Sequence, residues 1–396
     1  MKKFIALILS AIALTGCSAS ADAPGRSQGS GAYSSSPAAA PQITVSVPDG
    51  ATAEPPDTPL RISATKGTLV SVQVAPSGTQ ASGAHVAVSG TLDAGRRNWT
   101  PGRSLSPATT YTVHVTAAGS DGQRTTTRTK FTTATPSRTN RALLGPLDNQ
   151  VVGVGMPVTL RFDHPVINKA AVEKQLSVTT APTTEGSWGW VRDPHTGQER
   201  VDWRPAGYWR PGTKVTVKAA LSGIDTGGGR YLPRDISTTF AIGTTRIARI
   251  DLDAHRMVVT ENGRTVRNIP VSGGGPETPT HNGTMVVMDK VTEIRMNSET
   301  VGLGDAYNMM VKWAVHLTTS GTYVHAAPWN SALIGNTNAS HGCIGMNTGD
   351  ARWFYSRTQP GDIVITTGSA GAGLSVGNGL GDWNLTYKEW KKRSAV

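Results

Sequence analysis

Apolar and polar residues alternate in short runs along most of this chain, and long stretches with helical spacing are scarce. Residues 69–74, 111–115 and 158–162 place apolar side chains at every second position, as strands with one buried face do. Asn262-Gly263 lies between two apolar runs and is the strongest hairpin signal in the sequence. Residues 348–358 are the best helix candidate. The pattern predicts a mainly β protein.

A long segment of the chain occurs twice. Trp99 and Trp203 each open a Trp-x-Pro triplet, and they lie 104 residues apart. The same offset relates five further pairs: Leu105 and Trp209, Pro107 and Pro211, Thr109 and Thr213, Tyr111 and Val215, and Val113 and Val217. Each copy ends in a strand that carries Phe131 or Phe240. Several short strands in about 100 residues predict two immunoglobulin-like sandwiches. We expect Trp99 and Trp203 to pack in their cores rather than to act as ligand platforms.

The N-terminus has the pattern of an export signal. Lys2 and Lys3 precede an apolar run, residues 4–14, that is too short to span a bilayer. The run ends in Leu14-Thr15-Gly16-Cys17, which resembles a lipobox, and by that resemblance Cys17 becomes the lipidated first residue of the mature protein. The alternative is an ordinary signal peptide with a chance cysteine. The lipobox interpretation places the protein outside the cytoplasm, anchored to the cell membrane through lipid and facing the cell wall.

Shifts in composition divide the chain into segments. Residues 18–41 contain almost no large apolar side chains, so they are expected to form a flexible tether. The predicted segments are a signal peptide (1–16), the lipidated tether (17–41), two immunoglobulin-like domains (42–137 and 138–244), a third β-rich domain with a short helix (245–367), and a C-terminal tail that packs back (368–396).

The formal net charge of the whole chain is +11. Removal of residues 1–16 takes away two lysines and leaves +9. A basic balance favours an anionic partner such as nucleic acid, a membrane surface or a polyanionic wall, although it also serves solubility alone. Because the chain is expected to be exported, we predict no nucleic-acid partner.

The two cysteines have different neighbours. With Cys17 assigned to lipid, Cys343 has no disulfide partner and is either reactive or inert. It stands in Ser340-His341-Gly342-Cys343, among small and polar residues. Acyl transfer by a thiol needs a base or ion-pair partner and donors for the oxyanion. His341 is two residues away, His325 lies eighteen residues upstream at a predicted strand end, and the N–H groups of Gly342 and Cys343 are candidate donors.

The same residues also fit other uses. A lone cysteine is usually an inert core residue. A metal site made by His325, His341 and Cys343 lacks the fourth ligand of a structural zinc. Asp225, in a glycine-rich loop, has no second acidic residue nearby, so calcium is not expected there. We predict no metal and no cofactor.

The sequence His325-Ala326-Ala327-Pro328-Trp329, followed by Ser340-His341-Gly342-Cys343-Ile344, resembles the catalytic domain of YkuD-type L,D-transpeptidases. Residues 279–284, Gly361-Asp362 and the tail residues 379–384 support the resemblance. Together with the repeat and the lipobox, they are similar to the actinobacterial, mycobacterial-type lipoproteins of that family. One position departs: relatives often carry Arg or Asn two residues after the cysteine, where this chain has Gly345.

The resemblance implies a peptidoglycan cross-linking enzyme with its catalytic domain at 245–367. Cys343 would attack the diamino acid carbonyl of a donor tetrapeptide stem and release D-Ala. A side-chain amine of an acceptor stem would then resolve the thioester to give a 3→3 cross-link for cell wall biogenesis. Carbapenem-type β-lactams are expected to acylate the same thiol, and we expect a monomer.

The resemblance also implies roles for individual residues. His325 would be the base, or the imidazolium of a thiolate pair, oriented by a backbone carbonyl near Ala326. His341 would support the cysteine loop. The other residues expected to bind substrate or the oxyanion are Tyr307, Ser320, Gly321, Met296, Trp329, Ser340 and Gly342. Trp329 could equally anchor a lid.

Two other functions remain open on the sequence alone. A sortase-like cysteine transpeptidase or peptidase needs a catalytic arginine after the cysteine strand, whereas Arg352 and Arg357 fall on the predicted helix. A non-catalytic wall-binding lipoprotein would have no need for an intact Cys343 and His325.

Overall fold

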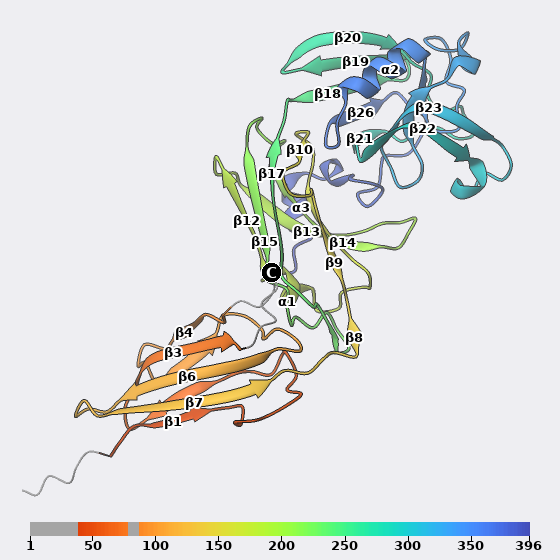
Figure 1. Cartoon of the computed structure of the whole chain (residues 1–396). Helices are drawn as coiled ribbons and strands as arrows, with labels where there is room; N and C mark the ends of the chain where they lie inside the picture. Colours follow the sequence, from red (N-terminus) through yellow and green to blue (C-terminus); the bar gives the residue numbers. More distant parts are fainter. Residues whose placement is uncertain (1–38, 78–86) are drawn as a thin grey trace, which may run out of the picture. The chain divides into compact units, whose positions relative to one another are not determined.

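The structure, a computed structural model, describes residues 39–77 and 87–396. The predicted signal peptide, Cys17 and nearly all of the predicted tether lie outside the described residues. Strands dominate the described part (Figure 1). Its α-helices are α1 (Lys169–Glu173), α2 (Thr348–Arg357) and α3 (Tyr387–Lys391), and its 3-10 helices are η1 (Ser298–Val301), η2 (Pro328–Asn330) and η3 (Asp382–Asn384). The prediction of a mainly β protein is confirmed.

The first sandwich consists of a four-stranded sheet, in the order β1-β2-β5-β4, and a three-stranded sheet, β3-β6-β7. The strands are β1 (Gln42–Val45), β2 (Ile62–Thr65), β3 (Thr68–Pro76), β4 (Gly90–Leu92), β5 (Asn98–Pro101), β6 (Thr110–Ala118) and β7 (Arg124–Thr132). Trp99, Tyr111 and Phe131 are buried between the sheets. The Tyr111 and Phe131 rings stack with their centroids 5.7 Å apart.

The second sandwich pairs the sheet β10-β17-β15-β12 with the sheet β13-β14-β11-β9, and β16 and β8 form a short ribbon. The strands are β8 (Arg138–Thr139), β9 (Ala142–Gly145), β10 (Val151–Val152), β11 (Val158–Phe162), β12 (Leu176–Ala181), β13 (Gly186–Arg192), β14 (Glu199–Pro205), β15 (Lys214–Ala219), β16 (Arg230–Tyr231) and β17 (Ile236–Ile242). Trp203 is buried on β14, as Trp99 is on β5. The repeat therefore places both tryptophans in cores, as predicted.

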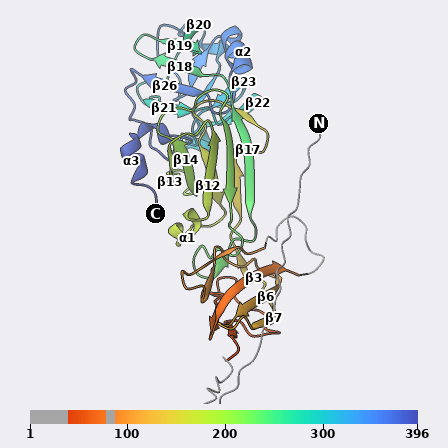
Figure 2. The same ribbon diagram turned by 90° about the vertical axis from the view of Figure 1, so that its left-hand side faces the viewer.

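The third domain has a five-stranded sheet, β20-β19-β18-β26-β21, and a four-stranded sheet, β22-β23-β24-β25. The strands are β18 (Arg246–Asp251), β19 (Arg256–Glu261), β20 (Arg264–Pro270), β21 (Gly283–Val286), β22 (Asp289–Asn297), β23 (Asn308–His316), β24 (Tyr323–Ala326), β25 (Ile344–Met346) and β26 (Ile363–Thr367). β18, β19 and β20 run side by side in both ribbon views (Figures 1 and 2).

Local signals define two connections of this domain. Asn262 and Gly263 join β19 to β20 with φ values of 48° and 79°, as a two-residue hairpin turn with both central residues left-handed requires. Asn347 caps α2 by accepting a hydrogen bond from the Asp350 N–H, which satisfies one free donor of the first turn. Phe354 turns inward from α2 and is buried.

The C-terminal tail packs back onto the folded body, as predicted, and part of it contacts the second sandwich. The Trp390 side chain is fully buried, and its Nε1–H donates to the Ser187 carbonyl at 2.9 Å. The Trp383 Nε1–H donates to the Gly155 carbonyl at 2.8 Å. The Arg204 guanidinium lies over both indole rings, 4.7 Å from the Trp383 centroid and 5.1 Å from the Trp390 centroid. The aromatic residues thus tie the chain end to β13 and β14.

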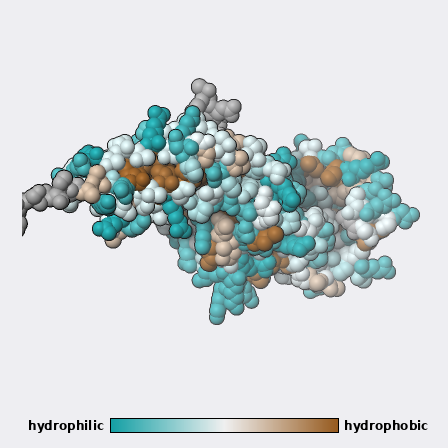
Figure 3. Space-filling model, turned by 90° about the horizontal axis from the view of Figure 1, so that it is seen from below, coloured by the Kyte–Doolittle hydropathy of each residue, from teal (hydrophilic) through white to brown (hydrophobic). Residues whose placement is uncertain are grey.

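Hydrophobic surface is divided into small groups on the face drawn in Figure 3, where most described residues are teal or white. Among the described residues, the most exposed large hydrophobic side chains include Ile167, Leu143, Leu147 and Val151. Scattered apolar residues of this kind are normal for a folded protein surface.

Candidate active site

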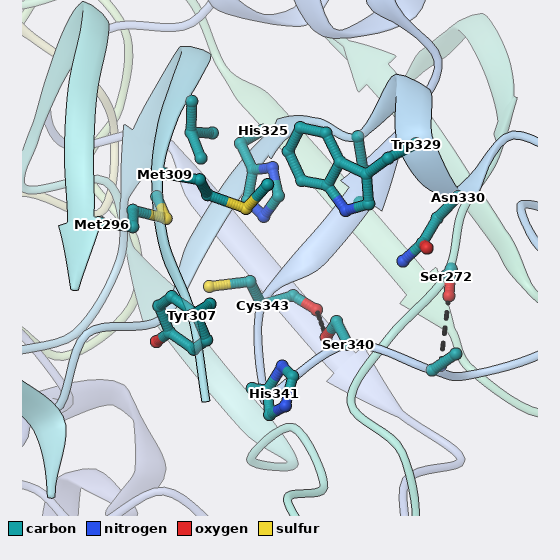
Figure 4. Close-up of a pocket in the computed structure, with 14 residues that line it drawn as sticks. Ser272, Met296, Tyr307, Met309, His325, Trp329, Asn330, Ser340, His341 and Cys343 are labelled. Carbon is teal, nitrogen blue, oxygen red and sulfur yellow. Dashed lines mark hydrogen bonds between the residues drawn. The ribbon is translucent and has the colours of Figure 1, made fainter. Parts of the chain in front are cut away.

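A pocket of about 230 Å³ opens beside Cys343 in the third domain (Figure 4). Its walls come from strands β22, β23, β24 and β25 and from the 3-10 helix η2. The segment after β20 and the loops before β23 and β25 complete them. The lining residues are Ser272, Met296, Tyr307, Met309, Val311, His325, Ala327, Trp329, Asn330, Ala339, Ser340, His341, Cys343 and Gly345. The pocket therefore brings together Cys343, His325, His341, Tyr307, Met296, Trp329 and Ser340 from the sequence prediction.

The loop that carries Cys343 is held by short-range hydrogen bonds. The Ser340 hydroxyl donates to the Cys343 carbonyl at 2.5 Å and accepts from the Gly342 N–H at 3.2 Å. The buried Thr280 hydroxyl donates to the Gly342 carbonyl at 2.9 Å. Gly342 has a φ of 106°, a backbone conformation that favours glycine. These contacts fix the peptide before the cysteine.

The Cys343 thiol is neutral in this environment. The residue is 9% exposed, and burial raises the pKa of its thiol to about 11, while the Tyr323 N–H works in the opposite direction. Sγ accepts from the Tyr323 N–H at 3.4 Å and donates to the Gly321 carbonyl at 3.5 Å. The thiol thus has two backbone partners on the segment that leads into β24.

His325 reaches the same pocket from β24, which runs parallel to β25 with His325 opposite Gly345. Its Nδ1 lies 2.9 Å from the Ala326 carbonyl. A carbonyl only accepts, so Nδ1 carries the proton and Nε2 of the neutral ring has a free lone pair. Burial lowers the pKa of His325, which favours this neutral form. The ring stacks on Trp329, with centroids 6.0 Å apart.

Two further rings flank Cys343 in Figure 4. The Tyr307 and His341 rings lie with their centroids 5.2 Å apart and are tilted by 50°. Burial, and the nearby Cys343, raise the pKa of the Tyr307 hydroxyl. The Tyr307 side chain therefore stays a neutral wall of the pocket and keeps its hydroxyl proton.

Three of the predicted residues lie outside the pocket lining. Gly342 contributes backbone to the loop, and Gly321 contacts Sγ from behind. The Ser320 hydroxyl accepts from Asn378 Nδ2 at 2.8 Å and lies 3.1 Å from the Thr318 hydroxyl, so it is engaged by the C-terminal tail and by its own turn.

Sequence reasoning missed several wall residues, among them Ser272, Met309, Val311, Ala327 and Asn330. Met309 lies directly opposite Met296 in the antiparallel β22–β23 pair. Pairing of these two strands by their alternating pattern would have found it. Ala327 and Asn330 follow His325 within five residues. Ala327 belongs to the segment that carries the family resemblance, and Asn330 comes directly after it.

Gly345 is a tightly packed part of the pocket wall. Its N–H donates to the Ser272 carbonyl at 2.8 Å, and its carbonyl accepts from the Ser272 N–H at 2.9 Å. A Cβ atom at this position would come within 3.0 Å of the Ala327 Cβ. The site of the departure from the family pattern is therefore a tight backbone pairing with no room for a side chain unless Ala327 shifts.

Within residues 39–77 and 87–396, no group of three or more His, Cys, Asp or Glu side chains could hold a metal ion. The Asp225 carboxylate accepts hydrogen bonds from the N–H groups of Gly227 and Arg230. It therefore orders its own loop.

Two family models match long segments of the chain. Residues 245–366 match the L,D-transpeptidase catalytic domain, and residues 51–225 match the bacterial Ig domain. L,D-transpeptidase 2 of Mycobacterium tuberculosis is 35% identical over 359 residues, which are 90% of this chain and 85% of the relative. The chain belongs to the L,D-transpeptidase family. L,D-transpeptidase 5 of the same species is 34% identical over 364 residues, covering 91% of this L,D-transpeptidase and 78% of the relative.

A solved structure of an L,D-transpeptidase in complex with imipenem aligns with a TM-score of 0.50 and 31% identity. The alignment covers 59% of this enzyme and 100% of that chain. Residues 1–18 match the prokaryotic membrane lipoprotein lipid attachment site, which indicates a membrane-anchored protein outside the cytoplasm. Among the described residues, none of the helices has the length and apolar character to cross a membrane.

Proposed function

We propose that this L,D-transpeptidase uses Cys343 as its nucleophile and His325 as its general base to cross-link peptidoglycan stem peptides. The observation that carries the proposal is that one pocket contains both residues, with His325 Nδ1 bonded to the Ala326 carbonyl at 2.9 Å. That bond leaves Nε2 as the basic atom. A base oriented by a third group beside a nucleophile is the general arrangement for covalent acyl transfer.

The first half-reaction starts from a neutral pair. Burial raises the pKa of Cys343 and lowers that of His325, so a preformed thiolate–imidazolium pair is disfavoured. As Sγ attacks the diamino acid carbonyl of the donor stem, His325 Nε2 takes the thiol proton. The imidazolium then gives this proton to the departing D-Ala amine, and an acyl thioester remains on Cys343.

The oxyanion needs donors that are free to point at it. The Gly342 N–H is engaged by the Ser340 hydroxyl at 3.2 Å, so we assign the Cys343 N–H as the backbone donor. The Tyr307 ring lies beside the Cys343 sulfur, with its hydroxyl on the far side of the ring (Figure 4). We assign it, with Met296 and Trp329, to contact with the stem peptide.

The second half-reaction reverses these proton transfers. A side-chain amine of the acceptor stem attacks the thioester, His325 Nε2 removes one amine proton, and the thiolate leaves and recovers that proton. The product is a 3→3 cross-link between the two stems. Carbapenems would acylate the same thiol by opening of the β-lactam ring, a hypothesis supported by the L,D-transpeptidase solved in complex with imipenem.

A sortase-like site receives no support from the pocket. Its lining, as far as the described residues form it, contains no arginine, and Arg357 on α2 pairs with Glu261 at 3.1 Å.

The test of the nucleophile is the intact mass of the purified protein after incubation with imipenem. We expect a gain of one imipenem mass, located by peptide mapping on the fragment that contains Cys343, and no gain in Cys343→Ala. An adduct that persists in Cys343→Ala, or no adduct on the wild type, would sink the assignment.

A further inference from the structure

The turn between β23 and β24 lies directly behind the Cys343 sulfur. Its residues 318–322 are closed by the Gly321 N–H donating to the Thr318 carbonyl at 3.0 Å and the Thr322 N–H donating to the Thr318 hydroxyl at 2.9 Å. The Gly321 carbonyl, at the end of this turn, is the acceptor for the Cys343 thiol. The position of the turn therefore decides one of the two hydrogen bonds at Sγ.

Asn378, from the C-terminal tail, holds this turn with its whole amide group. Its Oδ1 accepts from the Ser320 N–H and from the Thr319 hydroxyl, each at 3.0 Å. Its Nδ2 donates to the Ser320 hydroxyl at 2.8 Å. The side chain is 1% exposed, so water cannot readily replace these bonds.

The next residue of the tail adds a fourth bond and a close approach. The Gly379 N–H donates to the Thr319 hydroxyl at 3.1 Å. Gly379 has a φ of 68°, and a Cβ there would lie 2.7 Å from the Leu317 carbonyl oxygen. Only glycine lets the tail backbone lie this close to the start of the turn.

The tail is itself fixed from the other side by Arg200 of β14. Arg200 Nη2 donates to the Gly379 carbonyl at 2.7 Å, and its guanidinium pairs with Asp202 at 2.5 Å and lies 3.7 Å from Asp382. All three side chains are buried. A continuous set of contacts thus runs from the second sandwich through the tail and the turn to the Cys343 sulfur.

We propose that Asn378 is a positioning residue for Cys343, which holds the turn so that the Gly321 carbonyl stays against the thiol. The inference rests on the proposed function only in taking Cys343 as the nucleophile. The tail and the second sandwich then influence the reactivity of the thiol, because their contacts meet at Asn378 and Gly379.

The two hydrogen bonds at Sγ favour opposite protonation states. The Gly321 carbonyl can accept a hydrogen bond but cannot donate one, so it stabilises the protonated thiol. The Tyr323 N–H donates to the sulfur and therefore stabilises the thiolate. Tyr323 belongs to β24 and pairs with His316 of β23, so its N–H does not depend on Asn378. Without Asn378, the Gly321 carbonyl is held less firmly against the thiol, while the Tyr323 N–H stays in place. The thiolate of Cys343 should therefore form more easily.

The groups around the sulfur allow this effect to be measured. The titratable side chains near Cys343 are those of His325, His341, Tyr307 and Tyr323, and none of the described pocket-lining residues is a carboxylic acid. Measurements from about pH 7.5 to about pH 11 lie above the ordinary range of imidazoles. Burial raises the pKa of Tyr307 and raises that of Tyr323 to about 12, so the profiles report mainly the thiol.

The experiment compares Asn378→Ala with the wild type by the rate of alkylation with iodoacetamide across this pH range, followed by intact mass. We expect the rising part of the profile to shift to lower pH by at least half a pH unit, so that the rate at about pH 8 increases about threefold or more. Thr319→Val, which removes the hydroxyl that binds both Asn378 and Gly379, should shift the profile in the same direction.

Asn384→Ala is the matched control. Asn384 also ties the tail to the catalytic domain, since its Oδ1 accepts from the Thr284 N–H and its Nδ2 donates to the Thr284 carbonyl, each at 2.8 Å. It makes no contact with the turn, so its profile should match the wild type. If Asn378→Ala fails to fold, Thr319→Val decides the question.

Profiles of Asn378→Ala and Thr319→Val that coincide with that of Asn384→Ala would overturn the proposal. Iodoacetamide needs no substrate recognition, so this outcome is distinct from failure of the proposed transpeptidase activity. That failure would appear as a wild-type protein that is alkylated at Cys343 but converts a disaccharide-tetrapeptide to neither dimer nor free D-Ala.

Discussion

Replacement of Arg200 by methionine tests how strongly the tail is held to the second sandwich. The Arg200 side chain is 6% exposed and the Asp202 and Asp382 side chains are fully buried. Among the described residues, Arg200 is the guanidinium that pairs with both carboxylates within 4 Å. Removal of such a buried ion-pair partner typically costs about 3–5 kcal/mol of folding free energy. It also removes the hydrogen bond to the Gly379 carbonyl.

The loss of stability in Arg200→Met should depend on pH. Burial already raises the pKa of Asp202 and of Asp382, and Arg200 counteracts the rise. A carboxyl whose pKa is higher in the folded state binds its proton more tightly there, so ionisation destabilises the fold as pH increases. Without Arg200 both pKa values rise further. The destabilisation should therefore be larger at about pH 8 than at about pH 5.

Thermal unfolding followed by circular dichroism at both pH values measures this difference. Arg141→Met is the matched control, because Arg141 pairs with Asp163 at 2.7 Å with both side chains largely exposed, and exposed pairs contribute little. A fall in Tm for Arg200→Met no larger than that of the control, or a fall that shrinks as pH rises, would refute the reasoning.

Three further predictions concern the pocket and the tail. His325→Ala should slow imipenem acylation about 10²–10⁴-fold, and the residual rate should climb about tenfold per pH unit toward the thiol pKa of about 11; stopped-flow rates that stay flat with pH would contradict the general-base role. Gly345→Ala should destabilise the protein by about 1–3 kcal/mol through overpacking against Ala327, so an unchanged Tm would show that this wall yields freely. Trp390→Ala should cost about 3–5 kcal/mol in urea unfolding, whereas Val396→Ala, at an exposed chain end, should cost nothing measurable.

Features set by neighbours in sequence could be predicted well. The alternating run at 158–162 became β11, the Asn262-Gly263 turn joins β19 to β20, and the helix expected at 348–358 is α2 (Thr348–Arg357). Each depends on side-chain spacing or backbone preference within about ten residues, which a single sequence displays directly. Cys343 and His325 could also be picked out, because each lies in a short, characteristic motif, at residues 340–344 and 325–329.

Contacts between distant segments could not be predicted in the same way. Nothing in the sequence around Asn378 indicates that its amide binds Thr319 and Ser320, about sixty residues earlier. Ser320 was expected in the substrate cleft, yet its hydroxyl is engaged by the tail. Such pairings depend on how whole sheets pack, and no local pattern encodes them.

The central claim, that Cys343 and His325 form the cross-linking site, is tested most directly with a disaccharide-tetrapeptide as the substrate. The enzyme should convert it to a dimer that has lost one D-Ala, with tandem mass spectrometry placing the new bond between the two third residues, and Cys343→Ala should form none. A dimer made by Cys343→Ala, or wild-type enzyme that is alkylated at Cys343 yet yields neither dimer nor free D-Ala, would contradict the account.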